Sequence, residues 1–262
     1  MADVKKKSSA TKKRKNNTNK VLIGVLVGVV LLALFVTLSL TVFFNVSAIG
    51  TSGSKLYTTE EIVAASGIKV GDNLWLMNEA EAGARIAKTL PYIVSVKLEK
   101  QFPDKLIIVV TETKEYLTVS VKGKYYTANA EGKILDEVNT PSDKLILLTV
   151  SDKTSTVLGE TITFETEREK ELFGSFVKLS QKPEFDVNLI NMAEPFDTYI
   201  KLDGRIVVKF GSSSYFEEKT NYLKAGLTEI SKDSKGIFDL STWSPENNKP
   251  IFSHVDTSKY TF

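Results

Sequence analysis

The chain has 262 residues, of which 42% are hydrophobic and 25% are charged, which is typical of a protein with a globular core and not of a disordered or fibrous one. The lack of cysteine excludes disulfides, thiolate metal sites and a cysteine nucleophile, and a single histidine, His254, excludes a multi-histidine metal site. Eight of the 34 basic residues but one of the 32 acidic residues lie within 1–20, so residues 21–262 carry a net charge of about −5. We therefore expect no cofactor, no metal and no nucleic-acid partner.

An uncharged apolar run follows the basic residues. Residues 21–44 contain no charged side chain, and as a helix they would extend about 36 Å, enough to cross a hydrocarbon core of about 30 Å. The alternative is a cleaved signal peptide, because Val46-Ser47-Ala48 resembles a cleavage site. Signal peptides have apolar regions of only about 7–15 residues, so the sequence favours a retained transmembrane helix over 21–44.

The positive-inside rule gives the orientation of this helix. Residues 1–20 are basic, whereas the ten residues after the span carry no charge, which predicts a disordered cytoplasmic tail at 1–20 and an extracytoplasmic region from residue 45 onward. Gly24 and Gly28 are spaced for close packing between two transmembrane helices, although small residues are common in such spans. The sequence thus predicts a single-pass protein in the cell membrane.

Residues 45–114 show a β-α-α-β-β pattern. Thr58 and Glu61 have the spacing of a capping box, and Gly67 is a typical helix end. The predicted elements are a strand at 44–49 ended by Gly50, a helix from Thr58 to Gly67, a helix from Asn78 to about Thr89, and strands at 93–98 and 105–110. We expect the two helices to cover one face of a three-stranded sheet.

Residues 115–262 are predicted to form a β-rich domain with two helices. Asp203-Gly204, between two alternating runs, is a strong hairpin signal. Apolar spacing predicts helices at 166–182 and 215–231. The strands are expected at 116–121, 124–128, 133–137, 144–150, 185–191, 197–202, 205–210, 236–242 and 249–255.

Patterns typical of catalysis are weak. Ser175 and Lys178 fit a Ser-x-x-Lys motif, but the companion Ser-Asp-Asn and Lys-Thr-Gly motifs are absent, and Ser9 and Lys12 in the tail fit it equally well. His254 lies beside Ser253, yet neighbouring residues of a strand point to opposite faces. The sequence therefore does not predict an enzyme.

The order of these parts resembles the bacterial FtsQ/DivIB cell-division family. Its first extracytoplasmic domain, a POTRA domain, has matching motifs in order along the chain, and Tyr126 to Leu135 is similar to the start of its second domain. The matching positions are Gly50, Thr59-Glu60-Glu61-Ile62, Gly71-Asp72-Asn73, Pro91 and Phe102-Pro103-Asp104-Lys105-Leu106. The chain departs from the family pattern at Glu112 to Tyr116, where a Glu-Arg-x-Pro-like segment is usual.

The resemblance implies a fold and a function. The expected fold is a single-pass membrane protein with an α+β extracytoplasmic region, namely a POTRA domain at 45–114, joined by a hinge near 113–116 to the β domain at 115–262. The implied function is a noncatalytic divisome scaffold at the septum, which binds FtsB/DivIC-like and FtsL-like bitopic proteins and helps control septal peptidoglycan synthesis. Other divisome proteins would dock on the POTRA domain. Another membrane-anchored envelope binding or assembly protein with a POTRA domain, or a membrane-anchored envelope enzyme, are the alternatives.

The last predicted strand is the candidate binding surface. A terminal strand pairs on one side only, so its other edge invites strand addition. The candidate contact residues are Trp243, Ile251, Phe252, Ser253, His254 and Val255. The alternative is that Ile251 and Phe252 are core residues. Residues 256–262 are expected to form a loose tail, so that truncation after Val255 would be tolerated and Ser253→Pro would abolish binding without unfolding the domain.

Overall fold

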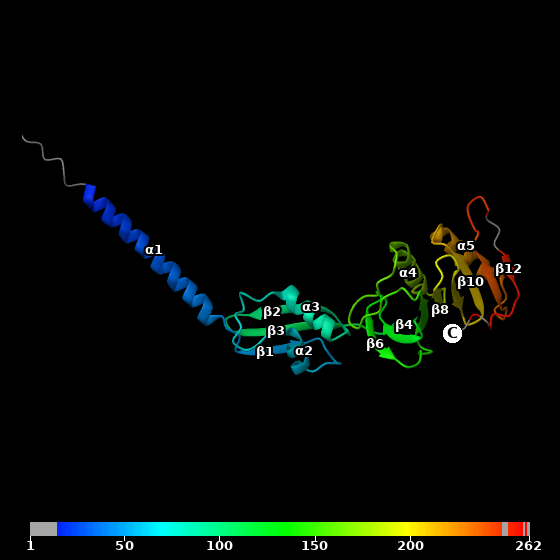
Figure 1. Ribbon diagram of the computed structural model, residues 1–262, viewed down its shortest axis with the longest axis horizontal. Helices are drawn as coiled ribbons and strands as arrows, with labels where there is room; N and C mark the ends of the chain where they lie inside the picture. Colours follow the sequence, from blue (N-terminus) through cyan, green and yellow to red (C-terminus); the bar gives the residue numbers. More distant parts are fainter. Residues whose placement is uncertain (1–14, 248–250, 259, 261–262) are drawn as a thin grey trace, which may run out of the picture.

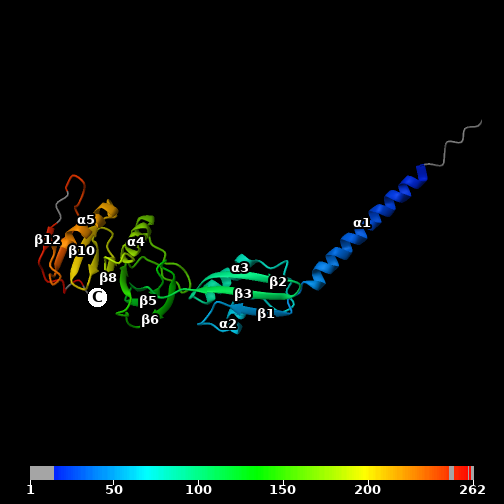
Figure 2. The same cartoon turned by 180° about the vertical axis from the view of Figure 1, so that it is seen from behind.

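A computed structural model describes residues 15–247, 251–258 and 260. Three parts follow one another in a row: a long helix, a small α/β domain and a larger β-rich domain (Figure 1; Figure 2 from behind). The strand nearest the C-terminus, β12, lies in the part farthest from the long helix. The predicted basic tail falls largely outside the described residues.

Helix α1 spans Lys15–Phe43. Its segment Lys20–Leu38 is apolar and long enough to cross a membrane, and none of it is buried against the rest of the chain. The apolar side chains of this segment have no protein partner within the described residues, which is the arrangement expected of a lipid-facing helix. The helix starts at Lys15, before the predicted span, so the prediction of a disordered tail was wrong for residues 15–20.

The first domain contains a three-stranded sheet in the order β1-β3-β2, with β1 parallel to β3. Helices α2 and α3 pack on it through Ile62, Ala82 and Ile86, all fully buried. Its elements are β1 (Ala48–Ser52), α2 (Thr59–Ser66), α3 (Glu79–Thr89), β2 (Ile93–Gln101) and β3 (Lys105–Glu112).

The ends of these helices follow the local signals, whereas the first strand does not. Thr58 and Glu61 form the expected capping box, and Gly67 ends α2 in the left-handed conformation. The prediction that Gly50 ends the first strand was wrong: β1 continues to Ser52, and Gly50 pairs with Ile107 of β3. Pairing with a central strand overrides the local tendency of glycine to end a strand.

The second domain is a nine-stranded mixed sheet with two helices. The strand order is β12-β11-β10-β9-β8-β7-β4-β5-β6. The elements are β4 (Leu117–Val121), β5 (Lys124–Ala128), β6 (Ile134–Val138), β7 (Ile146–Val150), α4 (Glu167–Ser180), β8 (Val187–Met192), β9 (Thr198–Leu202), β10 (Ile206–Gly211), α5 (Phe216–Glu229), β11 (Gly236–Asp239) and β12 (Ile251–Ser253).

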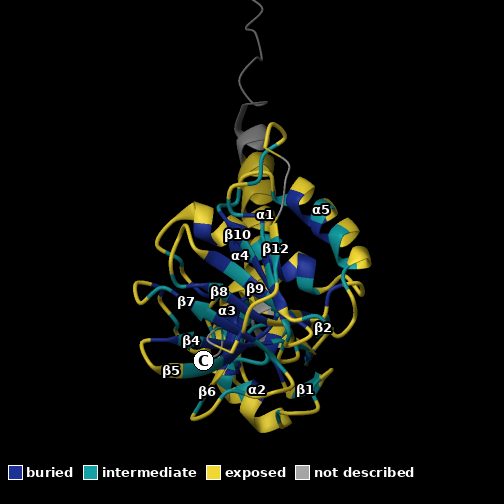
Figure 3. Ribbon diagram, turned by 90° about the vertical axis from the view of Figure 1, so that its right-hand side faces the viewer, coloured by how far each residue is buried: buried dark blue, intermediate teal, exposed yellow. Residues whose placement is uncertain are grey.

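Both helices of this domain cover one face of the sheet. The rings of Phe176 in α4, Phe210 in β10 and Phe216 of α5 lie 5.0–5.3 Å apart, so one aromatic cluster joins the two helices to the sheet. Figure 3 shows buried residues on the strands and on the inner sides of these helices, with exposed residues on the outer side of α5. The hairpin at Asp203 and Gly204 forms as predicted, with both residues at positive φ.

The junction between the two domains is hydrogen-bonded. The Lys133 ammonium donates to the carbonyl oxygens of Ala87 and Ile93 at 2.9 and 2.6 Å, and the Tyr92 hydroxyl donates to the Glu115 carboxylate at 2.6 Å. Lys133 is only 9% exposed. These contacts argue against the free hinge expected near 113–116, because bending there would leave the buried Lys133 ammonium group without its hydrogen-bond acceptors.

Candidate functional site: a free sheet edge

β12 is the last strand on one side of the nine-stranded sheet. It pairs antiparallel with β11 through Ile237↔Ser253, Phe238↔Phe252 and Asp239↔Ile251. No described strand pairs with its other side. Residues 249 and 250, where this strand was expected to begin, lie outside the described residues.

The register determines which backbone groups of β12 face outward. The Gly236 N–H donates to Arg205 and the Leu240 N–H to Lys209, so even-numbered residues of β11 face β10 and the odd-numbered Ile237 and Asp239 face β12. Their antiparallel partners, Ser253 and Ile251, therefore direct their backbone groups back toward β11.

Backbone directions alternate along a strand, so the free edge is formed by two other residues. Phe252 directs its N–H and C=O groups away from β11. β12 ends at Ser253, and continuing the same alternation by one residue gives the expected outward direction of the His254 N–H. Ser253 was expected to offer a donor to a partner strand, but its N–H belongs to the internal ladder. The outward donors at this edge are those of Phe252 and His254.

The side chains of the segment divide between the two sheet faces. Phe252 packs against the core, 6.3 Å from the Phe238 ring, and His254 contacts Phe252 edge-on at 4.9 Å. Ile251 is 65% exposed on the opposite face, and Val255 is also exposed. Phe252 is thus partly a core residue, whereas Ile251 is available to a partner.

Trp243 lies apart from this edge. Its ring is 6.1 Å from both Tyr215 and Tyr222, on the side of the domain that α5 covers. Its indole N–H is buried and has no hydrogen-bond partner among the described residues. The structure does not bring Trp243 together with Ile251 on one surface.

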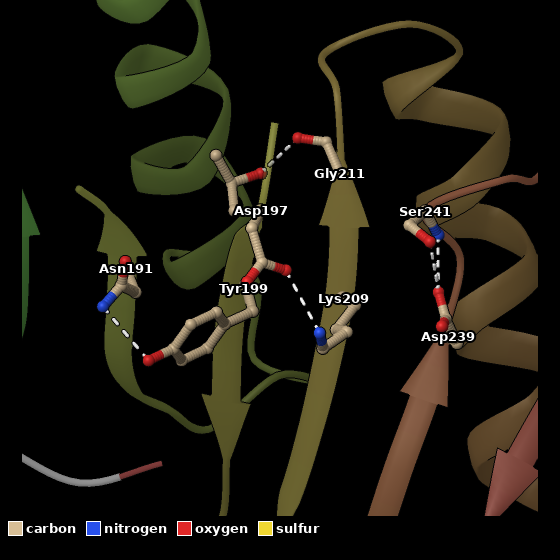
Figure 4. Close-up of polar contacts among 8 residues, drawn as sticks. Asn191, Asp197, Tyr199, Lys209, Gly211, Asp239 and Ser241 are labelled. Carbon is tan, nitrogen blue, oxygen red and sulfur yellow. Dashed lines mark hydrogen bonds and ion pairs between the residues drawn. The ribbon is translucent and has the colours of Figure 1, made fainter. Parts of the chain in front are cut away.

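Polar contacts join the strands farther inside the sheet and the end of β11 (Figure 4). The Asn191 amide donates to the Tyr199 hydroxyl at 3.1 Å, and Lys209 donates to Asp197 at 3.1 Å. Asp239 accepts from both the backbone and the hydroxyl of Ser241, a turn that ends β11 at Asp239, before the predicted residue 242.

The residues after β12 pack on the sheet. Thr257 is buried, and the Tyr260 ring meets that of Tyr199 at 5.1 Å. Lys201 donates to the Tyr260 carbonyl oxygen at 3.2 Å. The expectation of a loose tail does not hold for these two residues, and their only sequence signal is an aromatic residue in an otherwise polar segment.

Other candidate chemistry is weak in the described part of the chain. The Ser175 hydroxyl donates to the carbonyl oxygen of Glu171 in its own helix, at 2.9 Å, and Ser175 and Lys178 line a groove between α4 and α5. No cluster of three acidic or histidine side chains among the described residues is placed to hold a metal. Gly24 and Gly28 leave open space on α1.

Comparison with known proteins agrees with this architecture. The family model described as "POTRA domain, FtsQ-type" matches residues 44–113. "Cell division protein DivIB" of Clostridium botulinum strain Hall is 29% identical over 236 residues, covering 88% of this chain and 90% of the relative. "Cell division protein FtsQ" of Streptomyces venezuelae is 27% identical, covering 76% and 72%. The chain is thus similar to DivIB and FtsQ proteins over most of its length, and its first domain matches the FtsQ-type POTRA model.

The match to the family model identifies the first domain of the fold. The first domain is a POTRA domain of the FtsQ type, and the β-rich domain follows it. "Cell division protein DivIB" of Geobacillus kaustophilus is also similar, with 24% identity covering 76% of this chain and 73% of the relative. The similarity to DivIB and FtsQ proteins supports a role in cell division.

Proposed function

We propose that the chain is a membrane-anchored, noncatalytic divisome scaffold whose β12 edge receives a strand from a bitopic FtsB/DivIC-like protein. FtsL-like proteins would join the same complex, which would help control septal peptidoglycan synthesis. The observation that carries the proposal is the register of β12, which leaves the backbone groups of Phe252 and His254 unpaired within the described sheet. Main-chain hydrogen bonds to such an edge provide affinity, and alternate side chains provide specificity.

The side chains beside the edge fit this use. Ile251 and Val255 are exposed apolar residues flanking the free edge, and a partner strand would cover them. The ring of Phe252 packs in the core and holds β12 in place. It would therefore affect binding by positioning the free edge and not by contacting the partner. Trp243 then contributes by supporting α5 and not by direct contact.

The remaining parts have proposed roles consistent with the family. Residues 1–20 would lie in the cytoplasm, α1 would anchor the protein, and both folded domains would work outside the membrane at the septum. Other divisome proteins would dock on the POTRA domain, whose limits we place at 45–114. Gly24 and Gly28 would allow α1 to pack closely with another transmembrane helix.

Binding of the full-length protein to the extracytoplasmic region of its FtsB/DivIC-like partner tests the proposal. His254→Pro removes an outward donor, whereas His254→Ala removes the side chain and keeps that donor. We expect the proline variant to lose binding by calorimetry and the alanine variant to keep most of it. Circular dichroism should show that both remain folded.

Ser253→Pro provides a contrasting variant. Because Ser253 faces β11, proline there should break the internal ladder and lower the stability of the domain. Undiminished binding by a folded His254→Pro variant would overturn the edge proposal and make the POTRA domain the next candidate. A hydrolytic activity that disappears in Ser175→Ala would instead favour the envelope-enzyme alternative.

A further inference from the structure

An exposed aromatic cluster lies where α1 meets the POTRA domain. Phe44, Trp75 and Phe102 form it, with ring centroids 5.4–6.0 Å apart. We call these three residues the basal cluster. Trp75 is 59% and Phe102 52% exposed, and the neighbouring Leu76 is 82% exposed. Such a group of large apolar side chains on a soluble domain marks an interaction surface.

The backbone fixes this cluster at the end of α1. The Leu74 N–H donates to the Phe44 carbonyl oxygen, and the Val46 N–H donates to that of Asp72, both at 2.9 Å. The chain segment leaving the helix is therefore paired with the segment that carries Trp75. Figure 1 shows α1 joining the domain at the end where β2 turns into β3, the turn that contains Phe102.

The distance along α1 places the cluster at the membrane surface. The uncharged apolar run 21–44 has 24 residues, which corresponds to about 36 Å of helix, slightly more than the hydrocarbon thickness of about 30 Å. Phe44 is the last residue of this run, so it lies at the outer boundary of the hydrocarbon core. That position borders the headgroup region, where tryptophan and other amphipathic aromatic residues are favoured.

We infer that the basal cluster inserts into the outer headgroup region of the bilayer that α1 spans, and so fixes the tilt of the POTRA domain on the membrane. This inference rests on the proposed membrane anchorage. The bilayer is the occupant because the cluster begins one residue after α1 ends at Phe43.

Fluorescence of the full-length protein in liposomes tests the inference. The chain has two tryptophans, so Trp243→Phe leaves Trp75 as the only emitter, and Trp75→Phe leaves Trp243. We expect a spin label in the headgroup region to reduce Trp75 emission about twofold. A label at the bilayer centre should have a much smaller effect. Trp243, in the second domain, should respond to neither label.

The outcomes separate this inference from the anchorage itself. If the protein fails to float with the liposomes, the membrane anchor is wrong. If it floats but the headgroup label leaves Trp75 emission unchanged, the inference that the basal cluster inserts into the bilayer is wrong. As a second variant, Phe102→Ser should weaken the quenching of Trp75 while circular dichroism stays unchanged, and unchanged quenching would also count against the insertion of the cluster as a unit.

Discussion

Lys133 in the second domain donates a hydrogen bond of 2.6 Å to the carbonyl oxygen of Ile93 in the POTRA domain. Its second bond, to Ala87, supplies a donor to the last turn of α3, where carbonyl groups lack partners within the helix. Burial lowers the pKa of this ammonium group. A single side chain thus joins the two domains and completes one helix end.

Lys133→Met should lower the free energy of unfolding by about 1–3 kcal/mol, because two buried carbonyl groups lose their donor. Hydrogen exchange should also increase at the end of α3. The matched control is Lys88→Met, which removes a surface ion pair with Glu160 at the same junction and should cost less than about 1 kcal/mol. Equal effects of the two variants would show that Lys133 does not hold the domains together.

Gly159 tests how closely the two domains approach. Its φ is +79°, and an added Cβ would lie 2.4 Å from the Lys88 carbonyl oxygen. Gly159→Ala should therefore lower the free energy of unfolding by more than the roughly 1–2 kcal/mol expected from a left-handed backbone conformation alone. Gly123 has φ +73° with open space around it, so Gly123→Ala measures the strain alone. Urea unfolding compares them, and a Gly159→Ala variant as stable as the control would contradict the close junction.

Tyr92 gives the junction a pH dependence. Burial, followed by its hydrogen bond to Glu115, raises the pKa of Tyr92 to about 12, against about 10 in an unfolded chain. The stability from the protonated hydroxyl is therefore complete below pH 10 and is lost as the pH rises toward 12. In urea unfolding at pH 8.5 to 11.5, Tyr92→Phe should lose stability less steeply than the parent protein, and parallel curves would contradict this.

The C-terminal contacts predict that truncation after Val255 is not neutral. Removing Thr257 and Tyr260 exposes the Tyr199 ring and should lower stability by about 1–2 kcal/mol. Truncation after Tyr260 keeps these contacts and is the control. Thermal unfolding measures both variants. Equal unfolding midpoints would show that residues 256–260 do not contribute to stability.

Membrane orientation can be tested independently. A reporter that is active only outside the cytoplasm should work when fused after Phe262 and fail when fused before Val21, because the basic residues precede the span. The reverse pattern would overturn the charge argument. Recovery of a mature chain beginning near Ile49 would show that the apolar segment is a cleaved signal.

Local signals predicted much of this fold. The capping residues of α2 and the Asp203-Gly204 turn depend on neighbours within a few residues, so the sequence contains their full cause. Partners distant in the sequence decided the rest. The passage of β1 through Gly50 depends on β3, and the contacts of Lys133 depend on residues 40 and 46 positions away.

The candidate site was predictable in position but not in detail. The order of strands in the chain was enough to nominate residues 251–255 as an edge. Which of their N–H groups face outward depends on the register with β11, and no property of Ser253 or His254 alone reveals it. The structure therefore makes His254→Pro, and not Ser253→Pro, the substitution that tests the free edge.

The bond from Lys133 also bears on the order in which the protein is made. In the proposed orientation the chain crosses the membrane from its N-terminal side onward, so residues 45–114 would emerge while residue 133 is still to come. During that interval α3 lacks the ammonium group that its last turn uses in the finished protein. The POTRA domain should thus fold in two stages. The last turn of α3 would be less stable when the domain emerges and would gain stability once the following strands fold and place Lys133.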